Sequence, residues 1–141
     1  MGPPIRKESF YCGDWMKSLM QGEMKAIDSN HCPVVDVRDV GFAHLQAIKV
    51  ALAANRRFIV SHVSPTFQEL AQVVINKYAP LGWPVCQIKA ESEPKEDFSL
   101  FDNLASREVL GVVYTDFKKT MIDMADRMVE LGTVTKFSPS Q

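Results

Sequence analysis

Apolar residues recur at the spacing of an α-helix in two stretches of the first half of the chain. The first runs from about residue 9 to residue 21, and Gly22 follows it as a C-terminal stop signal. Its apolar side consists of Cys12, Trp15, Met16, Leu19 and Met20. The second follows Asp39, a good N-cap residue, and fades at residues 54–55. Its apolar side consists of Val40, Ala43, His44, Ala47, Ile48, Ala51 and Leu52.

Two further helices are predicted in the second half. Ser64 is the expected N-cap of one, with Pro65 at the first helical position, where its missing N–H costs nothing, and Pro80 as its end. The other opens at Thr115 and closes at Gly132. Its buried stripe consists of Phe117, Met121, Met124, Met128 and Leu131. The methionines on this stripe are expected to fill a core.

Short runs rich in Val, Ile and Phe lie between these helices and favour strands at residues 33–37, 57–61, 84–88 and 99–101. A shorter helix is expected at 104–110, and the charged stretch 91–97 is typical of a solvated loop. Helices that alternate with short strands predict an α/β domain with four to five helices. We expect one domain over residues 1–132, followed by a flexible tail at 133–141.

Composition and charge exclude several classes of protein. Of the 141 residues, 46% are apolar and 23% charged, as in an ordinary globular domain, and the net charge of −1 leaves no basic footprint for nucleic acid. No apolar run approaches the roughly 20 residues of a membrane span. The three cysteines form no Cys-x-x-Cys pair, and His31 beside Cys32 has no distant partner, so we expect no metal site. A cytoplasmic protein without a membrane partner is expected.

The run Pro33-Val-Val-Asp-Val-Arg-Asp-Val40, followed by Ala43-His44, resembles a segment of the extended short-chain dehydrogenases/reductases, within the NAD-dependent epimerase/dehydratase superfamily. It is similar to the branch of dihydroflavonol, cinnamoyl-CoA and methylglyoxal reductases. Further segments resemble that branch in the same order: Gly2-Pro3, R-F-I-V-S at 57–61, T-F-Q-E-L at 66–70, F-D-N at 101–103 with R-E-V-L-G at 107–111, and the closing helix at 115–128. Leu104 and Ala105 depart from the pattern, which has a small hydroxyl residue and a lysine there.

Several residues of the 33–44 run also have structural interpretations. Asp36 and Arg38 alternate with valines, so they would share one strand face and pair with each other or with a neighbour. Asp39 would cap the second helix, at a gain of roughly 1 kcal/mol. His44 falls on an apolar stripe, which favours a packed, hydrogen-bonded histidine.

Two parts that such reductases need are missing from this sequence. The glycine-rich turn that holds a dinucleotide pyrophosphate is absent, because the seven glycines are isolated from one another. Tyr114 and Lys118 do spell Tyr-x-x-x-Lys, but Tyr114 precedes the expected cap Thr115 and would not stack with Lys118 on one helical face. We interpret this pair as a coincidence. No catalytic, cofactor-binding or metal-ligating residue is therefore assigned to the chain.

The resemblance implies the C-terminal, substrate-binding part of an extended Rossmann-type reductase, without the nucleotide-binding half. In that arrangement Pro3 would lie near the nicotinamide, residues 30–33 would edge the substrate site, and the helix at 11–20 would cover it. The candidate substrate-binding residues are therefore Pro3, His31 and Pro33. The alternative for His31 is an exposed loop histidine.

Three hypotheses on function follow. In the first, the chain is a fragment or short gene product of an NAD(P)H-dependent reductase of aldehydes, ketones or dihydroflavonol-like carbonyls, binding no cofactor alone and inactive alone. The full-length family would use NADP or NAD. In the second, it is a non-catalytic binding or scaffold domain, and in the third a self-sufficient enzyme using Tyr114 and Lys118. A severed half-domain should expose apolar surface and self-associate. The sequence identifies neither the carbonyl substrate nor the preferred nucleotide.

Overall fold

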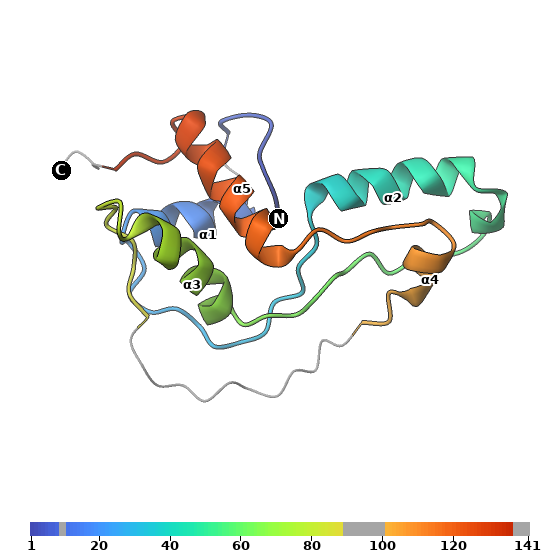
Figure 1. Cartoon of the computed structure of the whole chain (residues 1–141), viewed down its shortest axis with the longest axis horizontal. Coiled ribbons are helices and arrows are strands. Elements are labelled where there is room, and N and C mark those ends of the chain that lie inside the picture. The colour runs from blue at the N-terminus through green and yellow to red at the C-terminus, as the bar shows by residue number, and fades with distance from the viewer. Residues whose placement is uncertain (9–10, 89–100, 137–141) are drawn as a thin grey trace.

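The helices form two groups in space, as the computed structural model in Figure 1 shows. The structure describes residues 1–8, 11–88 and 101–136. One group, here called the bundle, consists of α1 (Tyr11–Met20), α3 (Phe67–Tyr78) and α5 (Phe117–Glu130). The other, here called the arm, extends to one side of the bundle and comprises residues 37–61 and 101–114. It contains α2 (Val37–Lys49), the 3-10 turn η1 (Ala51–Ala53) and α4 (Leu104–Glu108).

The bundle holds the larger apolar core. On α5, Met121, Met124 and Met128 are almost fully buried, as the apolar stripe predicted. They pack in one cluster with side chains of the other two helices, namely Met16, Leu19, Met20, Leu70, Ala71 and Val74. Methionine suits this interior because its unbranched side chain fills irregular gaps between crossing helices.

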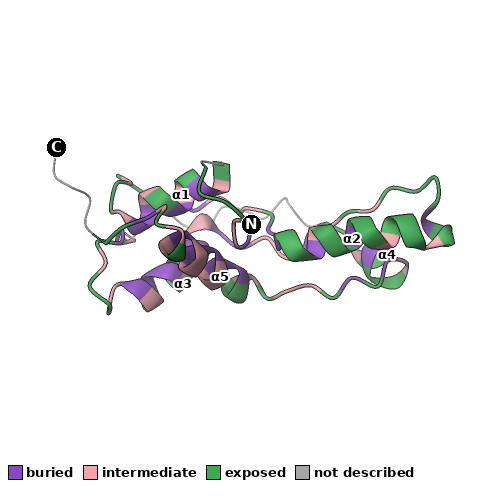
Figure 2. Cartoon of the chain, turned by 90° about the horizontal axis from the view of Figure 1, so that it is seen from above, coloured by how far each residue is buried: buried purple, intermediate pink, exposed green. Residues whose placement is uncertain are grey.

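The arm has a separate and smaller core. Its four buried members are Ala43, Ala53, Leu110 and Val112, packed against partly buried neighbours that include Phe58 and Val60. Figure 2 shows the contrast: α2 is exposed along most of its length, whereas α3 and α5 carry continuous buried faces. The arm therefore leaves large apolar side chains in contact with solvent.

Each long helix was predicted, but three N-caps differ from the expected residue. Asp36 caps α2, with its side chain accepting from the Arg38 amide, so Asp39 lies inside the first turn and the prediction that it caps was wrong. Asp39 instead accepts hydrogen bonds from Thr115. Both aspartates are competent caps, and each also has a long-range partner, Thr120 for Asp36 and Thr115 for Asp39.

The N-caps of α3 and α5 also lie later than expected. Thr66, not Ser64, caps α3, and it forms a capping box in which its side chain and that of Glu69 each bond the other's backbone N–H. Asp116, not Thr115, caps α5 by accepting from two amides of the first turn. Helix α1 ends one residue before the predicted residue 21, and the predicted start at residue 9 lies outside the described residues. Helix α4 ends two residues before the predicted Leu110.

The predicted short strands were wrong for the described residues. Within the described residues, β-pairing is limited to two isolated antiparallel bridges, Val34 with Val63 and His31 with Thr66. A strand persists only beside a partner, and no backbone hydrogen bond joins residues 57–60 to another described residue. The predicted loop at 91–97 and residues 99–100 of the last predicted strand lie outside the described residues.

Within the described ranges, no helix combines the length and the apolar character that crossing a bilayer requires.

Candidate functional site

The first residues of the chain are fixed beside the start of α2. The Met1 nitrogen donates to the Val35 carbonyl at 2.8 Å, and the Val37 amide donates to the Met1 carbonyl at 2.7 Å. Gly2 then turns the chain with φ 130°, and a Cβ at this position would lie 2.8 Å from Cγ1 of Val37. Only glycine fits this close approach. The chain continues past Pro4 and Ile5 above a hollow that Pro3 also lines.

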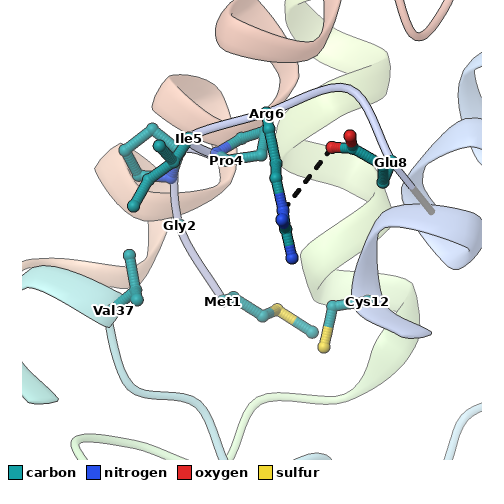
Figure 3. A pocket seen from close by; sticks show the side chains of 9 residues that line it. Met1, Gly2, Pro4, Ile5, Arg6, Glu8, Cys12 and Val37 are labelled. Atoms are coloured by element: carbon teal, nitrogen blue, oxygen red, sulfur yellow. Dashed lines mark ion pairs between the residues drawn. The ribbon is translucent and has the colours of Figure 1, made fainter. Parts of the chain in front are cut away.

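That hollow is an apolar cavity of about 370 Å³. Figure 3 shows Met1 and Cys12 pointing toward one another at its lower end, with Val37 on the opposite wall. The Arg6 and Glu8 side chains, both largely exposed, form an ion pair at 3.5 Å beside it. An exposed pair of this kind adds little stability but places polar groups at the entrance.

A second cavity, of about 560 Å³, shares Met1 and Cys12 with the first and continues under α1. Its apolar lining includes Trp15, Cys32 and Phe67. The Trp15 and Phe67 rings lie 5.6 Å apart between centroids, at a tilt of 46°. We call the two cavities together the N-terminal cleft. Their volumes fall in the range of small-molecule sites, and aromatic and sulfur-containing walls suit an apolar ligand.

The thiol of Cys32 is not activated as a nucleophile. Burial raises the pKa of the Cys32 thiol, and the nearby Cys12 raises it further. The thiol therefore stays protonated at neutral pH and acts as an apolar wall rather than as a nucleophile.

The structure brings one of the three predicted site residues to this cleft. Pro3 lines it. His31 lines a different cavity, of about 440 Å³, that also contains Ser29 and Gln68, and its Nδ1 lies 2.6 Å from the Ser64 carbonyl. Pro33 is exposed.

Between His31 and Pro33, Cys32 is the residue that faces the cleft, and sequence reasoning passed over it. Successive side chains of an extended segment point to opposite sides, so His31 and Cys32 cannot face the same cavity. That alternation was the available signal. The cleft residues Cys12, Trp15 and Phe67 carried only a helix pattern in the sequence.

An ionic junction centred on the buried Asp36 side chain supports the wall that Val37 provides. Asp36 accepts from Nη2 of Arg38 at 2.6 Å and from Oγ1 of Thr120 at 2.7 Å. Burial opposes its charge, but these bonds outweigh burial and lower the pKa of Asp36 to about 2. Arg38 also reaches Asp123 on α5 at 2.7 Å. The predicted Asp36–Arg38 pair is confirmed, although it forms at a helix cap rather than on a strand face.

The chain was compared with known proteins. No family's sequence profile matches it. It is 31% identical over 98 residues to the ketoreductase azaE of Aspergillus niger, a match covering 68% of this chain and 28% of the relative. It is 28% identical over 98 residues to the NADPH-dependent methylglyoxal reductase of Saccharomyces cerevisiae, covering 68% of this chain and 29% of the relative.

Solved structures extend the match to nearly the whole chain. Yeast methylglyoxal/isovaleraldehyde reductase, complexed with NADPH, superposes with a TM-score of 0.72 at 26% identity, over 93% of this chain and 44% of the reductase. This chain is a partial relative of the extended short-chain reductases. A Candida albicans reductase structure, Gre2, shares the fold with a TM-score of 0.73 over 93% of this chain and 42% of its own.

The chain spans less than a third of the length of the curated relatives it matches. Its Tyr114–Lys118 pair does not form a helical Tyr-x-x-x-Lys motif. Tyr114 precedes α5, its hydroxyl lies 2.7 Å from Oγ of Ser106, and its ring stacks on His62 with 5.4 Å between centroids. Lys118 is exposed on the first turn of α5. Tyr114 is thus a packing residue of the arm.

Proposed function

We propose that this chain forms the substrate-side wall of an NADPH-dependent carbonyl reductase and holds an aldehyde or ketone in the N-terminal cleft. The observation that carries the proposal is the apolar cleft itself, built from Pro3, α1 and Cys32. The relatives of this chain are named as ketoreductases and a methylglyoxal reductase, which supports a carbonyl compound as the ligand.

The N-termini of α2, α3 and α5 do not fit a dinucleotide pyrophosphate. A pyrophosphate is held by free backbone N–H groups at a helix N-terminus, usually after a glycine-rich turn. Here α2, α3 and α5 each begin with a side-chain cap that already accepts from those groups, and two of the caps, Asp36 and Asp116, are carboxylates. A carboxylate at that position repels a phosphate. The nicotinamide cofactor would have to be held by another part of a complete reductase, and the chain alone would be inactive.

The cleft residues can bind, orient and desolvate a carbonyl compound. The Trp15–Phe67 pair and the Met1 and Cys12 side chains offer an apolar surface to its alkyl part. The Arg6–Glu8 pair lies at the exposed side of the cleft, where a polar end of the ligand would remain in water. In this role the chain selects a substrate and contributes no group to hydride or proton transfer.

The second candidate is a non-catalytic binding or scaffold domain that kept this fold. The separate core of the bundle favours it, because a domain with its own core can persist without a catalytic half. The two candidates differ in one respect: only the reductase wall requires the N-terminal cleft to accept a carbonyl compound.

Trp15 fluorescence tests the proposal. In a Trp83→Phe background, Trp15 is the only tryptophan. Titration with isovaleraldehyde should change its emission with saturation, whereas NADPH should neither bind nor be oxidised. Cys12→Phe should abolish the response, because Cys12 lines both cavities. The matched control Lys17→Phe, at an exposed position of the same helix, should leave it intact.

Absence of any saturable response would overturn the carbonyl-binding role and favour the scaffold domain. Tight NADPH binding or aldehyde reduction by the 141-residue chain would instead show that it is a self-sufficient enzyme.

A further inference from the structure

Sulfur-bearing side chains from separate segments of the chain line the larger cavity of the N-terminal cleft. They are those of Met1, Cys12, Met24 and Cys32. Cys12 lies in the first turn of α1, whereas Cys32 lies in the segment that leads to α2. Figure 3 shows the side chains of Met1 and Cys12 pointing toward one another. The folded chain therefore brings to one cavity two cysteines that form no Cys-x-x-Cys pair in the sequence.

The backbone that carries each of these cysteines is held in place. The Cys32 amide donates to the Pro65 carbonyl at 2.8 Å, which fixes the segment before α2. On α1, Met16 lies one helical turn after Cys12 and is fully buried in the core of the bundle. Fixed positions suit a binding site, because little conformational freedom is lost when a ligand joins the two side chains.

Both thiols remain available to a ligand. Cys12 and Cys32 are free cysteines, and the Cys32 Sγ lies 3.9 Å from the Pro33 carbonyl, which is a weak contact. Burial raises the pKa of the Cys32 thiol, and the neighbouring Cys12 raises it further, so negative charge on the two sulfurs is unfavourable. A cation between them would reverse this preference, because a thiol that coordinates a metal ion loses its proton.

We propose that Cys12 and Cys32 bind a soft monovalent metal ion, Cu⁺, with the thioether of Met1 as a further ligand. Thiolate and thioether sulfur are the ligands that select Cu⁺. A structural Zn²⁺ site takes four ligands from cysteine, histidine and carboxylates, and the part of the chain that the structure describes contains no group of three such residues that could hold a metal. The site therefore favours Cu⁺ over Zn²⁺. Both thiols release their protons to solvent as the ion binds.

The metal site does not depend on the proposed carbonyl-binding function. Cys12 lines both cavities of the N-terminal cleft, so a bound ion and a carbonyl compound would compete for the same walls. Ligation by sulfur requires no carbonyl compound, however, and it is measured without one. Failure of the copper titration would therefore leave the isovaleraldehyde titration of the metal-free chain unaffected, and the reverse also holds.

Competition for Cu⁺ tests the site. Under anaerobic conditions with ascorbate, the full chain should withdraw an equimolar amount of Cu⁺ from bicinchoninate, whose copper complex is coloured. Cys12→Ser and Cys32→Ser should each weaken the binding by more than roughly tenfold, because a hard oxygen replaces a soft sulfur ligand. Cys86→Ala is the matched control: the third cysteine lines neither cavity, so its replacement should leave the affinity unchanged. Circular dichroism establishes that the variants fold.

A second measurement uses the wild type alone. Cu⁺ should protect Cys12 and Cys32 from alkylation by iodoacetamide, and peptide mass spectrometry identifies the modified cysteines. The proposal is overturned if the wild type takes no Cu⁺ from the chelator, or if Cu⁺ does not slow alkylation of these two cysteines. Binding that survives both serine substitutions would mean an adventitious ion only, and Zn²⁺ binding as tight as that of Cu⁺ would contradict the assigned ligands.

Discussion

At the scale of single residues, Asp36 carries the most consequential set of contacts. Its carboxylate accepts from the Arg38 amide, from Nε and Nη2 of the Arg38 guanidinium, and from the Thr120 hydroxyl. The side chain is fully buried. It caps α2 and joins the arm to α5 at the same time, so its loss would disturb both an element boundary and a tertiary junction.

Asp36→Ala should lower the free energy of unfolding by about 3 kcal/mol, because it removes a helix cap and leaves the buried Thr120 hydroxyl without this acceptor. Asp36→Asn should cost less, since asparagine also caps helices. Urea unfolding at neutral pH measures both. A loss below about 0.5 kcal/mol for Asp36→Ala, as at an ordinary surface site, would contradict this role.

Asp36 also makes the stability of the protein depend on pH, and the sign of this dependence follows from its pKa. The pKa of Asp36 is about 2 in the folded protein and about 3.9 in an unfolded chain, so the unfolded state takes up the proton first. Its contribution is complete above about pH 5 and is lost as the pH falls through 4 toward 2. The Asp36→Asn variant should lack this part of the acid destabilisation. Equal slopes of the unfolding free energy against pH in the wild type and the variant would refute this role of Asp36.

At the scale of elements, the sequence predicted which segments are helical better than where each begins. The apolar stripe of α5 contains three methionines of the packed interior. Their helical spacing predicts the helix whichever residue caps it. Starts are harder to predict because several competent caps stand close together, as Ser64 and Thr66 do. The capping box selected Thr66, since Glu69 is three residues after it and completes the reciprocal bond.

Thr66→Ala should lower stability by about 1 kcal/mol, through loss of the side-chain bond to the Glu69 amide. Thr66→Ser retains the hydroxyl and should recover most of that loss. The measurement is the urea midpoint of each variant. Equal destabilisation by alanine and serine would show that packing of the Thr66 methyl group, rather than the cap, matters.

At the scale of the whole molecule, the bundle and the arm have separate apolar cores joined by a few polar contacts. The arm core is small, with four buried residues of which two are alanines. Besides Asp36, the junction includes Asp39, which accepts from the Thr115 amide at 2.7 Å and from its hydroxyl at 2.9 Å. A small core with few links favours local opening of the arm without unfolding of the bundle.

Amide hydrogen exchange should be faster in α2 than in α3, because α2 belongs to the smaller core. Thr115→Val, which removes the hydroxyl bond to Asp39, should speed α2 exchange about fivefold, equivalent to about 1 kcal/mol. The α3 amides are the internal reference and should not change. If α2 and α3 open with one common free energy, the arm is not a separate unit.

The sequence by itself determined the helices, the methionine core of α5, the Asp36–Arg38 pair and the resemblance to part of a reductase. These follow from local periodicity and from neighbours in the chain, which need no knowledge of distant segments. It could not determine that Cys32 rather than His31 faces the cleft, nor that Met1 and Cys12 meet there. It also predicted strands that did not form among the described residues, because a strand depends on a partner that the run itself does not encode. Tertiary structure alone decided these points, since each depends on which segments far apart in the chain come together.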